Sequence, residues 1–267
     1  MKRLQYIVPT ICLIGLSSCK KDLDIIYHDI DPLTVIEAEL NHDGVRVGIR
    51  LTTPMDEPMD RTLLTDASVS ITDVTTGESY VLSPDSDGYF TNEVSGIAGH
   101  SYRLVVKRDG KVYQAETTMY PPTEFVSLGF NWIKMPYDYV EVLQARFEDT
   151  SDEDDYYWIK IYRNGEIYRW SEMSDSGDVD GVLTYVTMTS RKDTDKEDDD
   201  EVLYDGDIVT VTVSGISREM NDYLEALGND SNGPAMFTGD KCLGYFLASS
   251  PVSKTIVFHP DEITEYK

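Results

Sequence analysis

The residues of this chain with the most defined chemistry lie near its start, where residues 16–19 read Leu-Ser-Ser-Cys. Lys2 and Arg3 precede an apolar run over residues 6–16. A positive start, an apolar run and small residues before a cleavage point are typical of a secretory signal peptide. Leu-Ser-Ser-Cys is also the lipobox of bacterial lipoproteins, in which the cysteine is acylated and becomes the first mature residue. We therefore predict a signal peptide over residues 1–18 and lipid attachment at Cys19, against the alternative of an ordinary signal peptide that contains a cysteine.

No other pattern in the sequence indicates catalysis. There is no Gly-x-Ser-x-Gly motif for a nucleophilic serine, no Cys/His spacing that suits zinc, and no Gly-rich loop that leads into a helix. The four histidines are scattered, at positions 28, 42, 100 and 259. The 49 Asp and Glu residues are so numerous that some pair will always lie at glycosidase spacing, so they indicate nothing. We predict that the chain is not an enzyme.

Three acidic runs, at residues 152–155, 175–180 and 198–201, are rich in oxygen ligands for calcium. None has the Asp/Asn spacing, the turn glycine and the late Glu of an EF-hand loop. Runs of like charge are usually solvated loops. No cofactor is therefore predicted, and structural calcium stays as the alternative.

The best candidate for ligand recognition is a hairpin that turns at residues 164–165, Asn-Gly. With a two-residue turn, Ile161 would pair with Tyr168 and Ile159 with Trp170. The face that holds these four residues would then belong to the core. The opposite face would carry aromatic side chains between cationic ones, namely Tyr156, Trp158, Lys160, Tyr162, Ile167 and Arg169.

Such a face could stack on a sugar ring or hold a peptide. We select Tyr156, Trp158, Tyr162 and Arg169 as candidate ligand-binding residues. Two simpler interpretations stay open. Long cations could cover aromatic surface on a strand, or the face could contact a helix.

The charge of the chain limits its partners. Its 267 residues carry a net charge of −26, and removal of residues 1–18 takes away two cations and no acid. A body this acidic repels phosphate backbones, which excludes nucleic acid as a partner. No stretch after the signal approaches the ~20 apolar residues of a spanning helix, so contact with the membrane would be through the lipid anchor. Cys242 is the only cysteine left for the fold, and we expect it to be a small apolar core residue.

Apolar residues alternate with polar ones almost throughout residues 33–258, which predicts an all-β fold. A polar tether over residues 19–32 precedes an Ig-like N-terminal β-sandwich at 33–121. The clearest hairpin lies at 102–118 and turns at Asp109-Gly110, with Val106 opposite Tyr113 and Leu104 opposite Ala115.

Residues 122–267 form the predicted second domain, either a sandwich or a partly open barrel. Residues 208–213 give the cleanest alternation of valine and threonine in the chain. One short helix is predicted near 218–228, with Ser217 as its N-cap and Gly228 at its end. Its apolar stripe consists of Met220, Tyr223, Leu224 and Leu227.

Several turns and strand ends occur in an order that is similar to that of a known family. They are Gly88-Tyr89-Phe90, residues 99–104, 113–117, 147–149, 156–159 and 203–207, Tyr223-Leu224, and residues 243–249. Together they resemble the Bacteroidota lipoproteins grouped as domain of unknown function 4249, from about residue 33 to residue 258. The charged segment at 191–201 departs from the family pattern.

The resemblance implies an all-β cell-envelope lipoprotein with no catalytic residues to transfer. Only Cys19 matches a position with an assigned role. Such families often sit beside TonB-dependent outer-membrane transporters, so a transporter of this kind is an expected partner. Lys20-Lys21-Asp22 resembles the surface-export signal of these lipoproteins, although a solvated tether would look the same. We expect a lipid-anchored protein of the outer membrane that is exposed at the cell surface.

These observations favour a non-enzymatic accessory protein that captures a glycan or peptide, or assists a transporter. The main alternative is a structural or adhesive spacer at the surface. A glycan or peptide hydrolase is a weaker one. A binding protein predicts an accessible aromatic patch, a spacer predicts none, and an enzyme predicts a deep cleft with convergent acids.

Overall fold

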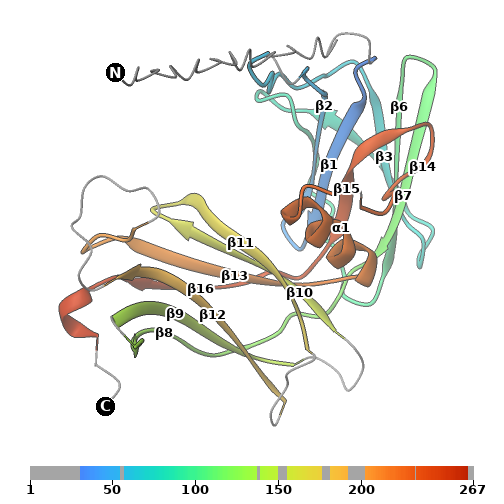
Figure 1. Cartoon of the computed structure of the whole chain (residues 1–267). Coiled ribbons are helices and arrows are strands. Elements are labelled where there is room, and N and C mark those ends of the chain that lie inside the picture. The colour runs from blue at the N-terminus through green and yellow to red at the C-terminus, as the bar shows by residue number, and fades with distance from the viewer. Residues whose placement is uncertain are drawn as a thin grey trace, which may run out of the picture.

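The computed structural model describes residues 31–54, 57–136, 139–149, 155–175, 181–191, 202–231 and 233–263. Figure 1 shows two β-domains that meet at a corner, where α1 (Arg218–Gly228) lies. The fold is all-β, as the alternation predicts, and α1 is the one α-helix in the described part. The predicted signal peptide, Cys19 and nearly all of the tether lie outside the described residues. No helix among the described residues has the length and apolar character that a bilayer crossing requires.

A nine-stranded sheet forms the first domain, in the order β14-β7-β6-β3-β4-β5-β2-β1-β15. It curls around a single core that takes residues such as Ile36, Val47, Leu104 and Phe246 from distant strands. β14 and β15, at opposite ends of the order, are joined by residues 240–241, and β15 also contacts β7. The strands are β1 (Thr34–Asn41), β2 (Gly44–Leu51), β3 (Ser68–Asp73), β4 (Ser79–Pro84), β5 (Phe90–Asn92), β6 (Ser101–Arg108), β7 (Lys111–Thr118), β14 (Thr238–Gly239) and β15 (Cys242–Ala248).

The β6–β7 hairpin has the predicted register. Val106 pairs with Tyr113, and Leu104 pairs with Ala115. Asp109 and Gly110 both have positive φ, 50° and 76°, as a type I′ turn requires. This part of the sheet was therefore predictable from local sequence.

The strand β15 lies in the first domain, whereas the sequence division at residue 121 places it in the second. It runs parallel to β1, with Ile36 opposite Gly244. A parallel partner some two hundred residues away leaves no local signal in the sequence, because no tight turn joins the two strands. The chain therefore crosses to the second domain after β7 and returns at β14 to complete the first sheet.

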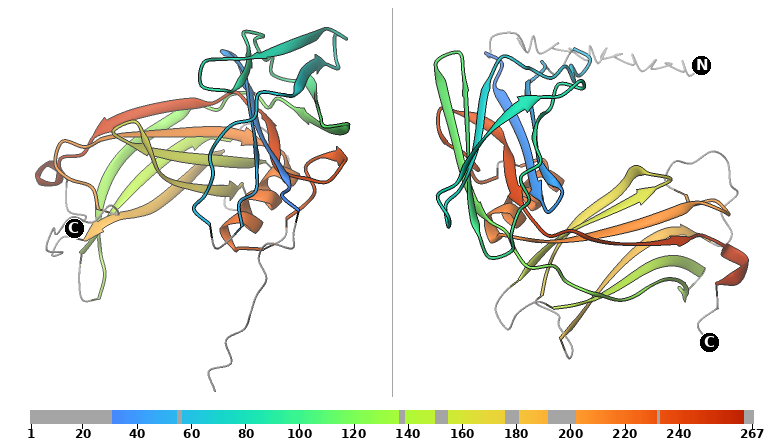
Figure 2. Two further views of the ribbon diagram at one scale, coloured as in Figure 1. Left: turned by 90° about the horizontal axis from the view of Figure 1, so that it is seen from above. Right: turned by 180° about the vertical axis from the view of Figure 1, so that it is seen from behind.

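The second domain is a sandwich of two separate sheets, ordered β11-β10-β13-β16 and β12-β9-β8. Both sheets contribute to one core, which includes Leu143, Ile159, Val211 and Phe258. In the rear view of Figure 2 the two sheets lie one above the other. The strands are β8 (Phe125–Lys134), β9 (Tyr139–Glu148), β10 (Tyr156–Arg163), β11 (Glu166–Ser174), β12 (Val182–Arg191), β13 (Ile208–Ile216) and β16 (Val252–Val257).

The predicted helix is confirmed, and it closes the corner between the domains. The Ser217 hydroxyl accepts a hydrogen bond from the backbone N–H of Met220, at 3.2 Å. Helix α1 contacts β10 and β11 and adds its buried side chains to a third apolar group. We call this group the junction cluster, and it consists of Trp158, Ile216, Met220, Leu224 and Leu247. Because Leu247 comes from β15 and Trp158 from β10, the cluster belongs to both domains.

We predict that Gly244→Ala destabilises the protein strongly. Gly244 has a φ of 106°, and a Cβ there would lie 1.9 Å from the backbone oxygen of Ile36. Relief of that clash requires β15 to move away from β1, so we expect a loss of about 3 kcal/mol or more in the free energy of unfolding, measured in urea.

Gly77→Ala is the matched control. Gly77 also has positive φ, 82°, but no heavy atom would lie within 4 Å of a Cβ there. The Gly77→Ala substitution should lower the free energy of unfolding by about 1 kcal/mol. Equal losses in the two variants would contradict the importance of the close β1–β15 contact.

Candidate functional site

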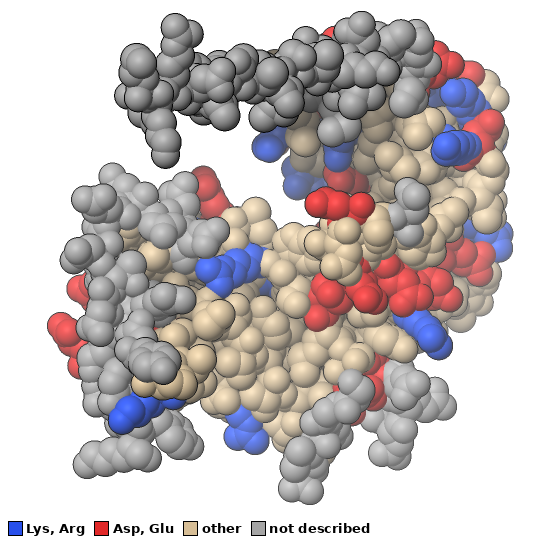
Figure 3. Space-filling view, viewed as in Figure 1, with Lys and Arg blue, Asp and Glu red and all other residues tan. Residues whose placement is uncertain are grey.

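A cavity of about 580 Å³ opens where β1, β2 and β5 of the first domain face β10 of the second. We call it the junction groove. Figure 3 shows the hollow between the two domains, with acidic side chains gathered over α1 at its inner end. Its size lies within the range of about 300–1,000 Å³ that is typical of ligand pockets.

The strand period explains why polar residues line this groove. On β1, Ile36, Ala38 and Leu40 enter the core of the first domain. Successive side chains of a strand point to opposite faces. Glu37 and Glu39 therefore face outward, into the groove.

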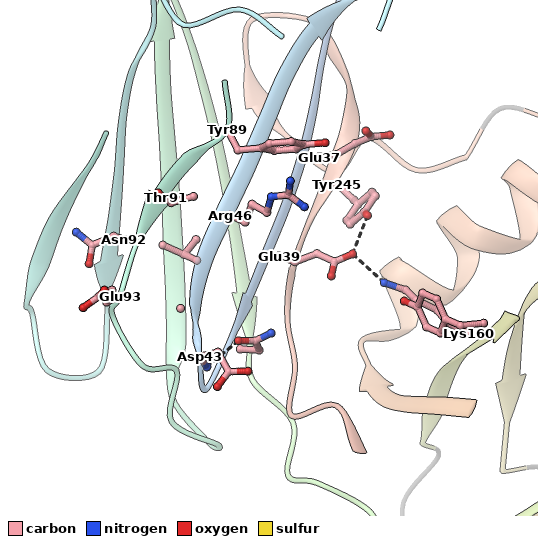
Figure 4. A pocket seen from close by; sticks show the side chains of 14 residues that line it. Glu37, Glu39, Asp43, Arg46, Tyr89, Thr91, Asn92, Glu93, Lys160 and Tyr245 are labelled. Atoms are coloured by element: carbon pink, nitrogen blue, oxygen red, sulfur yellow. Dashed lines mark hydrogen bonds and ion pairs between the residues drawn. The ribbon is translucent and has the colours of Figure 1, made fainter. Parts of the chain in front are cut away.

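One ion pair connects the two domains across the groove. The Lys160 Nζ of β10 lies 2.8 Å from the Glu39 Oε1 of β1, and the Tyr245 hydroxyl of β15 donates to the same oxygen at 3.1 Å. Figure 4 shows both contacts as dashed lines. The Lys160 ammonium also lies over the Trp158 ring, 3.7 Å from its centroid. Burial, with a further contribution from the charge of Glu39, raises the pKa of Tyr245 far above its usual value.

A cation–π pair forms the opposite side of the groove. The guanidinium carbon of Arg46, on β2, lies 3.4 Å from the centroid of the Tyr89 ring. A Cβ at Gly48 would lie 3.1 Å from Tyr89 Cε1, so the ring lies close against β2 because residue 48 has no side chain. Among the described residues, Arg46 has no carboxylate within ion-pair distance, although Glu39 is directly opposite it on β1.

The groove continues into a smaller cavity of about 200 Å³ between the domains. The two cavities share Glu39, Asn41, Lys160 and Tyr162. Beyond these residues the walls carry mainly small hydroxyl side chains, namely those of Thr212, Ser214, Ser249 and Ser253. The two cavities therefore adjoin at the shared residues, with Tyr89 in the larger cavity and most of the hydroxyl side chains in the smaller one.

The structure places Trp158 in the junction cluster, where its side chain is only 8% exposed. Its ring meets the Trp170 and Tyr245 rings edge-on, with centroids 6.5 Å and 5.7 Å away. Tyr156 packs against the same cluster. Both simpler interpretations of this hairpin face describe Trp158, which packs in the cluster with α1 and is covered by the Lys160 ammonium. Contact with the helix cluster also describes Tyr156.

The predicted register of the β10–β11 hairpin is wrong by one residue. The turn has two residues, as predicted, but the pairing shifts after Tyr162 and Ile167. Ile161 is opposite Arg169, and Lys160 is opposite Trp170. The bulge at Tyr168 has a physical effect, since Tyr168 contacts the second core while Trp170 reaches the junction cluster on the other face.

Arg169 lies away from the other three candidate residues. Its guanidinium lies 4.9 Å from the centroid of the Tyr168 ring and donates to the backbone carbonyl of Met188 on β12. It therefore bridges the neighbouring edges of the two sheets of the second domain. Tyr162 is the one of the four candidates that lines the junction groove.

Sequence reasoning missed Glu39, Arg46, Tyr89 and Tyr245. Glu39, Arg46 and Tyr245 alternate with core residues, as residues on the solvated side of an ordinary strand do, and Tyr89 comes directly before β5. The signal that could have found Tyr89 is the Gly88-Tyr89-Phe90 motif, in which Phe90 is buried and Tyr89 must point the other way.

Other residues noted in the sequence have structural settings. His100 Nδ1 lies 2.8 Å from Asp73 Oδ2, and His259 Nδ1 lies 2.8 Å from Asp205 Oδ1. Cys242 packs half-buried against the first core, and burial raises the pKa of its thiol to about 11. Of the three acidic runs, the structure describes only residues 155 and 175. Within the described residues, no three His, Cys, Asp or Glu side chains form a group that could hold a metal ion.

The model of a family described as "Domain of unknown function (DUF4249)" matches residues 20–255, which is most of the chain and spans both domains. No curated protein matches the chain.

We predict that Trp158→Ala weakens the protein and uncouples its domains. Loss of a buried indole from the junction cluster should lower the free energy of unfolding by about 3 kcal/mol or more. Because this cluster is shared by both domains, unfolding in urea should then show two transitions instead of one.

Ile167→Ala, on the neighbouring strand, is the control. The Ile167 side chain is 57% exposed, so this substitution should change the free energy of unfolding by no more than about 0.5 kcal/mol. An unaltered unfolding curve for Trp158→Ala would show that the cluster does not couple the domains.

Proposed function

We propose that this chain, which belongs to the DUF4249 family, is a lipid-anchored cell-envelope protein that captures a ligand in the junction groove. The observation that carries the proposal is the groove itself. It combines two adjoining cavities, oriented aromatic rings and convergent polar groups, which is the usual composition of a ligand site.

The proposed location follows from Cys19 and from the charge of the body. An acidic chain is not attracted to anionic lipid, so a covalent anchor would supply the membrane affinity. A stable anchor needs two lipid signals, which a diacylated cysteine provides. We place the protein at the outer membrane of a member of the Bacteroidota, exposed at the cell surface, with a TonB-dependent transporter as its candidate partner.

Binding fits the groove better than hydrolysis does. The two carboxylates of β1 each have a cation beside them, since Glu39 pairs with Lys160 and Glu37 pairs with Arg50 at 3.2 Å. A hydrolase needs carboxylates that are free to contact the scissile bond, whereas these two are engaged by cations of the protein itself. We therefore propose capture without chemistry.

A spacer role is the second candidate, and the junction cluster favours it. A shared apolar cluster between two domains would hold them at a fixed angle, as a spacer requires. The two roles differ in what they need from the groove, because a spacer works equally well with the groove filled.

We predict that Cys19→Ser moves the protein from the envelope to the soluble fraction. The change removes the sulfur that would carry the lipid and leaves the described fold untouched. Cell fractionation followed by immunoblotting measures the distribution. Cys242→Ser is the control and should stay in the envelope, because Cys242 is the cysteine that packs in the fold. Equal sedimentation of Cys19→Ser and wild type would contradict the anchor.

We predict that Thr91→Trp keeps the protein in the envelope but removes its bound material. Thr91 lines the groove opposite Arg46, so an indole there would fill the cavity. Native mass spectrometry of protein purified from its own cells should show at least about tenfold less co-purified ligand.

Thr72→Trp, on the exposed face of β3, is the matched control for added bulk. It should retain the ligand in full. The spacer role would be supported, and capture contradicted, if wild type and Thr91→Trp carried the same material or none.

A further inference from the structure

We infer that the junction groove binds a neutral oligosaccharide. The inference rests on the proposed capture function and names the chemical class of the ligand. It follows from five properties of the groove: the pairing of the strands in its walls, its polar groups, its aromatic rings, its charge and its length.

The backbone of β1, β2 and β10, which supply most of the wall residues, is already paired, and this disfavours an extended peptide. β1 lies between β2 and β15, β2 pairs with β5 over the residues that line the groove, and β10 lies between β11 and β13. A peptide that binds by strand addition needs an open sheet edge. No such edge faces the groove among these strands, so a ligand must be recognised by side chains.

The polar side chains of the groove suit a ligand with many hydroxyl groups. Glu37 and Glu39 present carboxylate oxygens, and Arg46 and Lys160 present donors. The amide oxygens of Asn41 and Asn92 already accept from the backbone N–H groups of Asp43 and Val94. A hydroxyl both donates and accepts, so adjacent sugar hydroxyls can use the two kinds of group side by side. Figure 4 shows Arg46 and Glu39 beside each other in the groove.

Tyr89 provides an aromatic platform that is already oriented. Arg46 lies over the ring, and the missing side chain at Gly48 lets the ring lie close to β2. Tyr162 offers a second ring from the other domain. The electron-rich face of an aromatic ring attracts the C–H groups of a pyranose. Because Arg46 covers one face of the Tyr89 ring, a pyranose would stack on the face that Arg46 does not cover. A ring that is fixed before binding costs less ordering entropy.

The charge of the groove favours a neutral ligand. Lys160 and Arg50 already pair with Glu39 and Glu37, so a cationic ligand would compete with them. An anionic ligand drawn to Arg46 would meet Glu39 directly across the strand pair, with Asp43 and Glu93 at the rim. The negative charges of these carboxylates would repel an anionic ligand.

The length of the groove indicates more than one sugar ring. From the Tyr89 end the site passes Glu39 and Lys160 and continues into the second cavity, where hydroxyl side chains predominate. Hydroxyl groups exchange hydrogen bonds with sugar hydroxyls without adding charge. An oligosaccharide would occupy both cavities, whereas a monosaccharide would occupy one.

The test uses the full-length protein purified from its own cells in a detergent without a sugar headgroup. Fluorescently labelled protein is applied to an array that carries neutral oligosaccharides, oligogalacturonates and unstructured peptides. We expect binding to one or more neutral oligosaccharides, and an affinity at least about tenfold lower for Tyr89→Ala. Tyr89→Phe keeps the ring and should bind within about twofold of wild type.

Tyr204→Ala is the matched control for loss of a tyrosine from a cation–π pair. In the second domain, the guanidinium carbon of Arg163 lies 5.1 Å from the centroid of the Tyr204 ring. The Tyr204→Ala variant should bind the oligosaccharides as the wild type does. Far-UV circular dichroism and the urea midpoint confirm that each variant is folded.

Two failures can be distinguished. If only oligogalacturonates or peptides bind, and Tyr89→Ala abolishes that binding, the groove is a ligand site but the inference about a neutral oligosaccharide is overturned. If nothing on the array binds, or if Tyr89→Ala binds as wild type does, both the inference and capture in the groove are overturned.

Discussion

Two neighbouring side chains on one face of β10, Trp158 and Lys160, determine how the two domains meet. The lysine ammonium covers the indole at 3.7 Å and reaches Glu39 of the first domain at 2.8 Å, while the indole itself lies against α1 and β15. Trp158 thus belongs to the apolar cluster, and Lys160, two residues further along the same face of β10, forms the ion pair. The corner between the domains and the groove above it both depend on this arrangement.

The contacts of these two side chains differ in energy. Burial of a large aromatic side chain contributes on the order of 3 kcal/mol, whereas an ion pair with a partly exposed partner contributes about 1 kcal/mol or less. The Glu39 side chain is 43% exposed, so the ion pair belongs to the weaker class. The junction cluster therefore holds the domains together. The ion pair adds little stability but fixes where the Glu39 and Lys160 side chains point, and this defines the polar centre of the groove.

Local features were predictable from the sequence, and distant pairings were not. The β6–β7 hairpin and α1 lie where they are predicted because their signals, Asp109-Gly110 and the Ser217 cap, are local. Leu227 is the exception in the predicted apolar stripe of α1, because its side chain is 53% exposed. The parallel pairing of β15 with β1 has no such signal, and the bulge at Tyr168 has no glycine or proline to mark it. That bulge moved Trp170 to the other face and changed the expected recognition surface. Four of the groove residues come from β1, β2, the β4–β5 turn and β15, so they could be identified only after those pairings were known.

The polarity of the facing side chains explains why the groove stays open while the junction beside it is closed. Near α1 the facing side chains are apolar and are buried against one another. Beyond Lys160 the facing residues are Glu37, Glu39 and Arg46, with hydroxyl side chains on the neighbouring strands. To bring these groups into dry contact would remove water from charges that lack full compensation, and that costs more than the buried area returns. Water or a polar ligand must therefore fill the space, and a ligand that replaces the hydrogen bonds of that water gains the site with little rearrangement of the protein.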